Sequence, residues 1–346
     1  MDPHPKARLG GLDALRGYAA VAVMLLHAGS LLKTPWLMPS GYLAVDLFFV
    51  MSGFVIAHSY DAKLPTLGLW GFMKVRAVRL YPVYLLGLGL GLPCGAILAL
   101  RHAQSLGGVA SAFGANLFFL PAPPSAFAAG AISPLDGPAW SLFFEMWINI
   151  LYGLLFPRLS ARVLSVIVFT SAGFLATLAF SSSSLNGGPY WSTFATGAAR
   201  VCFSFPLGVL LYRWRDRLPD LSPAAPLVLF GLIGGFEIPG SAWHDLAFVL
   251  LASPLLVIAA SQGRAKPALA AYGAAASYCL YAIHFPLFQL LSGATHMLGV
   301  NPIILTFALI AALLVLCPII DRLYDRPLRR WLGSNRKEAS EQGAAP

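Results

Sequence analysis

Two apolar runs near the start of the chain carry ionisable side chains that a lipid environment disfavours. Arg16 and His27 interrupt the first run, LDALRGYAAVAVMLLHAG, and Asp46 interrupts the second, GYLAVDLFFVMSGFVIAHSY. Charged groups inside a bilayer are costly, so those that do occur there mark functional sites by default. We therefore expect residues 12–60 to contain the core of an active site.

His27 and Asp46 are predicted to act as a base and the group that orients it. Each lies about five residues from the connecting loop, and a rise of 1.5 Å per residue places both at a depth of roughly 8 Å. A carboxylate beside an imidazole selects one tautomer and stabilises the imidazolium formed when the ring accepts a proton. This arrangement suits the deprotonation of a hydroxyl group.

Three polar side chains of later apolar segments are predicted to reach the same depth. They are Glu145, Arg200 and His284, and Ser141 and Tyr281 lie about one helical turn from Glu145 and His284 on the same faces. Taken singly, each fits a hydrogen-bonded or ion-paired structural residue. Ionisable groups at one depth on five helices instead favour a polar cavity or catalytic centre.

No serine or cysteine has the surroundings of a nucleophile. The GxSxG pattern is absent, and Ser52 and Ser141 are interpreted as hydrogen-bonding across helices. The four cysteines lie in apolar runs without CxxC or Cys/His spacing, so we expect no disulfide framework and no metal site.

A second group of candidate residues lies in the segment 67–82, LGLWGFMKVRAVRLYP, where basic and apolar side chains alternate. Lys74, Arg76 and Arg79 can anchor an interfacial helix to anionic lipid. They can equally form a phosphate clamp, because arginine binds phosphate oxygens through two parallel hydrogen bonds. The sequence is compatible with both a lipid anchor and a phosphate clamp.

The composition is that of an integral membrane protein with one membrane domain. Hydrophobic residues make up 58% of the 346 residues and charged residues 11%, with a mean hydropathy of +0.73, whereas soluble proteins contain about 25% charged residues. The net charge of +9 does not require a nucleic-acid partner, since cytoplasmic loops of membrane proteins collect lysine and arginine.

The apolar runs predict an all-α, polytopic membrane helix bundle of about ten transmembrane helices, because about 20 apolar residues span a bilayer. The expected spans are 12–32, 41–60, 80–100, 139–156, 162–181, 193–213, 224–238, 244–261, 270–292 and 301–324. The span 224–238 is the weakest. The segment 113–120 is too short to cross and is interpreted as re-entrant.

Basic residues predict that both termini are cytoplasmic. With the N-terminus inside, only Lys33 and Arg101 among the 23 lysines and arginines fall in outside loops. We expect the membrane domain to cover 1–324, and the charged segment 325–346 to form a disordered cytoplasmic tail.

Five blocks of the chain together resemble the acyltransferase-3 family of bacterial integral membrane acyltransferases. The blocks are LDALRGYAAVAVMLLH, GYLAVDLFFVMSGFVI, KVRAVRLYPVY, PAWSLFFEMWINILY and SYCLYAIHFPLF, and they extend from residue 9 to about 290. The family's Arg-x10-His pattern matches Arg16 and His27, and its Arg-x-x-Arg pattern matches Arg76 and Arg79. Its tryptophan, serine and glutamate block matches Trp140, Ser141 and Glu145.

The resemblance implies a ten-helix enzyme of the bacterial cytoplasmic (inner) membrane. Such an enzyme takes an acyl group, usually acetyl, from cytoplasmic acyl-coenzyme A and transfers it to a hydroxyl of a cell-envelope or secreted glycan or glycolipid. Some members carry a C-terminal hydrolase-like domain. Here the membrane domain, or a separate periplasmic transferase, is expected to complete the transfer.

Together these interpretations assign a role to each candidate residue. The predicted catalytic residues are His27, Asp46 and Glu145; the predicted coenzyme A-binding residues are Arg16, Lys74, Arg76 and Arg79; the predicted acceptor-binding residues are Trp140, Ser141, Arg200, Tyr281 and His284. An acyl-His27 intermediate is the alternative to direct transfer. The alternative function is a secondary transporter or exporter, to which intramembrane His, Asp and Arg are also natural.

Overall fold

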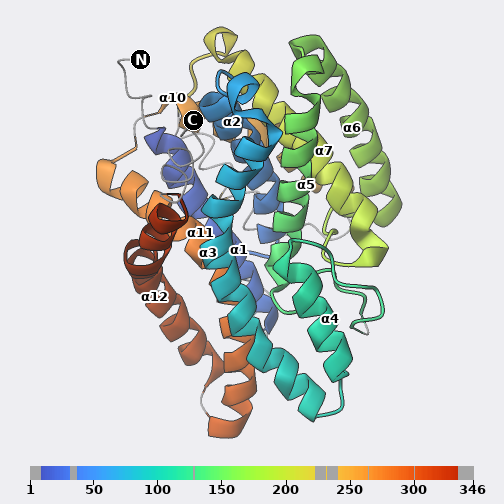
Figure 1. Cartoon of the computed structure of the whole chain (residues 1–346), viewed down its shortest axis with the longest axis vertical. Helices are drawn as coiled ribbons and strands as arrows, with labels where there is room; N and C mark the ends of the chain where they lie inside the picture. The colour runs from blue at the N-terminus through green and yellow to red at the C-terminus, as the bar shows by residue number, and fades with distance from the viewer. Residues whose placement is uncertain are drawn as a thin grey trace, which may run out of the picture.

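Long apolar helices make up most of the chain. The computed structural model describes residues 9–31, 37–127, 129–222, 231, 241–263, 265–299 and 301–333. Within these residues eight helices are long and apolar enough to cross a membrane, judged by length and composition. Figure 1 shows them side by side along the long axis, with α6 and α12 at opposite edges. The predicted class, a polytopic helical membrane bundle, is confirmed.

The helices follow the chain in this order: α1 Gly10–Leu31, α2 Ala44–Tyr60, α3 Leu64–Leu100, α4 Leu106–Leu117, α5 Trp140–Leu155, α6 Ala161–Ser182, α7 Phe194–Arg213, α9 Ala242–Ala247, α10 Ser253–Gln262, α11 Pro267–Leu298 and α12 Pro302–Ile320. A π-helical turn, Phe248–Ala252, joins α9 and α10 into one apolar segment. The predicted span 224–238 lies, apart from residue 231, outside the described residues.

The third helix is longer than the sequence predicts. A boundary was expected near residue 80, between the basic segment 67–82 and the span 80–100, but α3 runs through it. The only non-helical residue within α3 is Gly68, whose positive φ of 67° suits a residue without a Cβ. Pro82 and Pro93 lie inside the helix, which packed membrane helices tolerate. The stretch of α3 that follows the kink at Gly68 therefore carries both Arg76 and Arg79.

The short helix α4 does not cross the membrane. Its 12 residues reach about 18 Å, against a hydrocarbon core of about 30 Å. After it the chain folds back, because the Asn116 amide donates to the carbonyl oxygens of Leu120 and Ile132. The Tyr84 hydroxyl of α3 donates to the Asn116 carbonyl. The loop before α5 is thus fixed on α3.

Helices α1 and α11 pack backbone against backbone and run in the same direction. A Cβ on Gly273 would lie 2.1 Å from the carbonyl oxygen of Asp13, and one on Gly17 would lie 3.1 Å from the Gly273 Cα. Such close approach is typical of small residues between membrane helices. The contact fixes the relative height of every later residue on the two helices.

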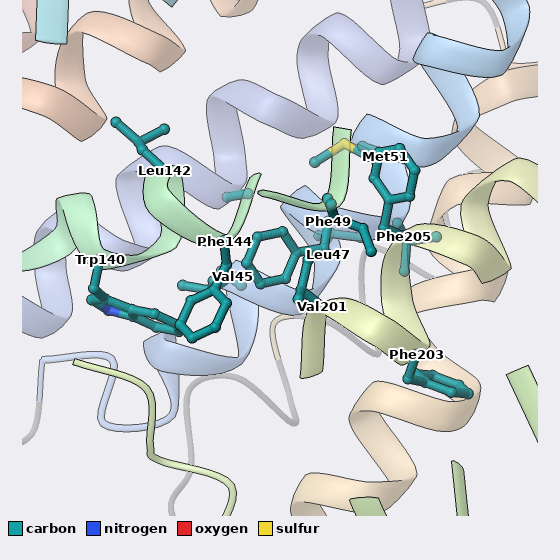
Figure 2. Close-up of a cluster of buried hydrophobic side chains, with 14 of the residues drawn as sticks. Val45, Leu47, Phe49, Met51, Trp140, Leu142, Phe144, Val201, Phe203 and Phe205 are labelled. Carbon is teal, nitrogen blue, oxygen red and sulfur yellow. The ribbon is translucent and has the colours of Figure 1, made fainter. Parts of the chain in front are cut away.

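Helices α2 and α7 form a second parallel pair with the same kind of contact. A Cβ on Gly53 would lie 2.0 Å from the Phe205 carbonyl oxygen, and one on Gly208 would lie 2.0 Å from that of Val50. Figure 2 shows the apolar cluster that these helices share with α5, in which Phe144 belongs to α5. Side chains on every face of α2 are buried, as expected of a helix inside a bundle.

The C-terminal part is more ordered than predicted. Past Ile320 the chain makes a π-helical turn, Asp321–Asp325, and remains helical to residue 333. Arg326 pairs with Asp321 at 2.7 Å, and Arg329 pairs with Asp325 at 2.7 Å. These pairs within about one helical turn support the helix. The chain is thus helical over 326–333, where a disordered tail was expected, and 334–346 lie outside the described residues.

Asp136, just before α5, is a fully buried carboxyl group. Its exposed fraction is 0%, and within the described part of the chain neither carboxyl oxygen has a hydrogen-bond partner. A Cβ on Gly87 of α3 would lie 3.1 Å from its Oδ2. Burial raises the pKa of Asp136 well above its usual range. Burial without a hydrogen-bond partner thus favours the neutral form of the Asp136 carboxyl group.

We predict that Gly273→Ala destabilises the protein by about 1–3 kcal/mol, because the new methyl group must push α1 away from α11. The thermal unfolding midpoint in detergent measures this. Gly89→Ala on α3 is the control, since a Cβ there meets no atom within 4 Å. Equal midpoints for the two variants would contradict the close α1–α11 contact.

We predict that Asp136→Asn gains stability relative to the wild type as the pH rises. A carboxyl group whose pKa is raised on folding binds its proton more tightly in the folded state, so the wild type loses stability above the unfolded pKa of about 3.9. The amide does not titrate. Thermal unfolding midpoints at pH 5 and pH 8 test this, and a difference between the proteins that is the same at both values would contradict it.

Candidate active site

A cavity whose largely apolar lining carries several charged and hydroxyl side chains opens between α1, α2, α3, α5 and α11. Its volume is about 820 Å³, including open space at its mouth, and its lining includes Arg16, Arg76, Arg79, Glu145 and Tyr281. Three helices that are distant in sequence contribute its charged groups. The sequence predicted the basic segment 67–82 as one group and the intramembrane residues, including Arg16 and Glu145, as another. The fold brings members of both groups into one cavity.

The three arginines predicted to bind coenzyme A share this cavity. Arg76 and Arg79 come from consecutive turns of α3, and Arg16 comes from α1, where it also pairs with Asp13 at 3.8 Å. Three guanidinium groups suit a ligand with several phosphates. Lys74 is exposed and does not line the cavity, so the structure does not place it with the arginines.

Glu145 lies with the arginines rather than with the histidines. Its Oε1 accepts from the Arg76 guanidinium at 2.8 Å, from the Ser52 hydroxyl at 2.5 Å and from the Asn149 amide at 3.3 Å. The predicted grouping of Glu145 with the two histidines is therefore replaced by a contact with Arg76 of α3. The carboxylate orients one arginine of the cavity and offsets part of its charge.

The predicted pair between His27 and Asp46 does not form. Asp46 is fully buried and accepts from the Arg200 guanidinium through both oxygens, at 2.7 Å from Nη2 to Oδ2 and 3.2 Å from Nε to Oδ1. Arg200 also donates to the carbonyl oxygens of Tyr42 and Gly187. Equal depth did not imply contact, because Asp46 faces α7 whereas His27 faces α11.

The remaining contacts of Arg200 indicate a structural role. The Trp140 ring lies 5.5 Å from its guanidinium carbon, a cation–π arrangement. At the other end of α2 and α7, Arg213 donates to Asp61 at 2.8 Å. The two ion pairs hold the same two helices together at both ends, and neither Trp140 nor Arg200 lines the cavity.

His27 is paired with the second intramembrane histidine, His284. The His27 Nδ1 atom lies 2.9 Å from the Val23 carbonyl oxygen and 3.2 Å from the His284 Nε2 atom. The Nδ1 atom of His284 lies 2.6 Å from the Leu280 carbonyl oxygen. His284 is fully buried, whereas His27 is partly exposed. Of the two residues, His27 is the more exposed.

Tyr281 and Ser141 lie between the cavity and the histidine pair. Their hydroxyl oxygens are 2.6 Å apart, and the Tyr281 hydroxyl also donates to the Pro138 carbonyl. The Tyr281 ring centroid is 6.3 Å from that of His284 and 5.6 Å from that of Phe48. Both residues line the cavity, and His27 does not. Polar groups thus extend from the arginines toward His27.

Some hydrogen-bonding residues near the cavity were predicted correctly from the sequence, and others were missed. The cross-helix hydrogen bonds predicted for Ser52 and Ser141 are confirmed. Asn149 was missed, although it follows Glu145 by one helical turn and is fully buried. Asp136 was missed because it precedes the apolar run. In the described part of the chain no three His, Cys, Asp or Glu side chains lie close enough to hold a metal ion.

Comparison with known proteins reveals several related sequences. A family model described as an acyltransferase domain, Acyl_transf_3, matches residues 9–322. "Protein 2 in picA locus" of Rhizobium radiobacter is 38% identical over 50% of this chain and 95% of its own length. The exopolysaccharide production protein ExoZ of Rhizobium meliloti is 30% identical over 63% of this chain and 64% of its own length.

The O-acetyltransferase OatA of Staphylococcus aureus is 28% identical over 54% of this chain and 32% of its own length. The chain thus matches less than two thirds of ExoZ and about a third of OatA. No solved structure matches it. The family model, in contrast, covers every block of the cavity and the histidine pair, and the chain belongs to the Acyl_transf_3 family of acyltransferases.

Proposed function

We propose that the protein is a membrane O-acyltransferase that moves an acetyl group from acetyl-coenzyme A to a hydroxyl of a cell-envelope or secreted glycan. The observation that carries the proposal is the cavity with three arginines, whose lining residue Tyr281 packs against His284, the partner of His27. We place the enzyme in the bacterial cytoplasmic membrane, with the cavity open to the cytoplasm.

The arginine cavity suits the donor. Coenzyme A carries phosphates that cannot enter hydrocarbon without compensation, and Arg16, Arg76 and Arg79 supply cationic donors for them. The phosphates would stay at the arginines while the narrow pantetheine arm extends along the cavity toward Tyr281. Glu145 keeps Arg76 oriented, so part of the binding geometry exists before the donor arrives.

His27 suits the chemistry of transfer. Its ring would accept the proton of the acceptor hydroxyl as the hydroxyl oxygen attacks the thioester carbonyl. The carbon–sulfur bond then breaks, and the leaving thiolate takes the proton from His27, so that an ester, a free thiol and neutral His27 result. General-base assistance contributes about 10² to 10⁴-fold to such reactions. His27 is partly exposed and can receive an acceptor.

The relatives support the acceptor and acyl classes. ExoZ is an exopolysaccharide production protein and OatA is an O-acetyltransferase. A saccharide hydroxyl and an acetyl group are the simplest substrates compatible with both names. A separate periplasmic transferase would be needed only if the membrane domain hands the acetyl group on rather than to the final acceptor.

We predict that His27→Ala lowers acetyl transfer by about 10² to 10⁴-fold without loss of folded protein, because the base is removed. Radiolabelled acetyl-coenzyme A with the enzyme in liposomes and an envelope glycan measures the transfer. His102→Ala is the control, since His102 is exposed beyond the end of α3. Near-normal activity of His27→Ala would refute its role. Solute flux that does not need coenzyme A would favour a transporter instead.

We predict that Arg79→Ala raises the KM for acetyl-coenzyme A about tenfold or more, since a charge-assisted hydrogen bond to phosphate is lost. Lys74→Ala is the control, because Lys74 is exposed outside the cavity. With acetyl-pantetheine, which lacks the nucleotide phosphates, the Arg79 variant and the wild type should differ little. An equal defect with both donors would show that Arg79 does not bind phosphate.

A further inference from the structure

The contacts of His27 and His284 indicate which of their ring nitrogens carry hydrogen. We propose that His284 is a positioning residue that, together with the Val23 carbonyl, holds His27 in the tautomer with hydrogen on Nδ1 and thereby leaves His27 Nε2 free to act as the base. The sequence predicted that Asp46 orients His27 and that His284 binds the acceptor. This inference rests on the proposed function and assigns the orienting role to His284.

The hydrogen bonds of the two rings determine where the protons lie. A carbonyl oxygen can only accept, so the His284 Nδ1 atom, 2.6 Å from the Leu280 carbonyl oxygen, must carry a hydrogen. In a neutral ring the other nitrogen is then an acceptor. The Nε2 atom of His284 therefore presents a lone pair to His27.

The same rule applies to His27. Its Nδ1 atom lies 2.9 Å from the Val23 carbonyl oxygen, so it too carries a hydrogen. That N–H is shared with the His284 Nε2 atom at 3.2 Å. Two acceptors on one side stabilise a single tautomer, and the Nε2 atom of His27 is left without hydrogen on the side away from His284.

Burial separates the two roles. His284 is fully buried, and both of its nitrogens are engaged, so it has no ring nitrogen left for an acceptor hydroxyl. His27 is partly exposed. A buried residue that touches the base but not the substrate acts through the base.

His284 also suits the charged form of His27. When His27 Nε2 takes a proton, the Nδ1–H becomes a stronger donor, and the Val23 carbonyl and the His284 lone pair both accept it. Asp46 cannot contribute, because its oxygens are bound to Arg200. A neutral imidazole performs this task without placing another buried anion in the membrane.

The α1–α11 register makes the pair possible. The Gly17–Gly273 contact lies about ten residues before the histidines on both helices. Because the helices run in the same direction, the two rings meet at one height, with centroids 5.1 Å apart. The Phe285 ring packs edge-on against His27 at 5.2 Å. His27 is thus held on two sides by α11.

The tautomer can be measured without any activity assay. In purified protein labelled with ¹⁵N-histidine, His27→Ala identifies the His27 signals. We expect the wild-type His27 to show a protonated Nδ1 and an unprotonated Nε2. In His284→Phe, which fills space but offers no acceptor, only the Val23 carbonyl still accepts from Nδ1, so we expect a measurable fraction of the tautomer with hydrogen on Nε2. A wild-type His27 with hydrogen on Nε2, or an unchanged tautomer in His284→Phe, would overturn the proposal.

Kinetics provide the second measurement. His284→Phe should lower kcat about 10- to 100-fold, as expected for a group that acts through another residue, and leave the KM for acetyl-coenzyme A unchanged. His284→Gln, whose amide oxygen can accept the His27 N–H, should restore most of kcat and the wild-type tautomer. Normal kcat in His284→Phe, or equal loss in both variants at wild-type stability, would overturn the proposal.

The two measurements distinguish failure of the proposed function from failure of the positioning role of His284. If the wild type transfers no acetyl group, the proposed function fails, whereas the ¹⁵N spectra still report whether His284 sets the tautomer of His27. If the wild type is active and the spectra of wild type and His284→Phe agree, the function stands and the positioning role of His284 is refuted.

Discussion

The close contact between α1 and α11 is the constraint on which the site depends. Gly17 and Gly273 let two backbones touch where any side chain would separate them. Since both helices run in the same direction, this one contact aligns everything farther along. It brings His27 to His284 and leaves Arg16 in the cavity that α11 also lines. Arg16 of the cavity and the His27–His284 pair are thus located at two heights of one helix pair.

Buried charge is distributed over separate groups rather than one polar layer. Asp46 and Arg200 neutralise one another between α2 and α7, where an unpaired charge would be strongly destabilising. Glu145 and Arg76 form a second pair, which lines the cavity. The first pair holds helices together, whereas the second leaves the cavity with excess positive charge. Similar residue types therefore have different roles because their neighbours differ.

Predictions from the sequence were correct where they depended on neighbouring residues, and they failed for contacts between residues that are distant in the chain. Helix α1 carries Arg16 and His27 on one continuous helix, and their spacing depends only on helical rise. The cluster of Arg76 and Arg79 was likewise recognisable from local pattern. The partner of His27 was not, because depth in a membrane constrains one coordinate, whereas contact also depends on the direction in which each helix face points.

The sequence by itself determined the membrane class, most helix positions, the family, and the residue types available for chemistry, because these depend on hydropathy and local spacing. Only the tertiary structure decided which groups meet: His27 with His284 rather than Asp46, and Glu145 with Arg76 rather than the histidines. The physical reason is that helix rotation and register are set by backbone contacts at glycines far from the site, such as Gly273. Those contacts join residues distant in sequence.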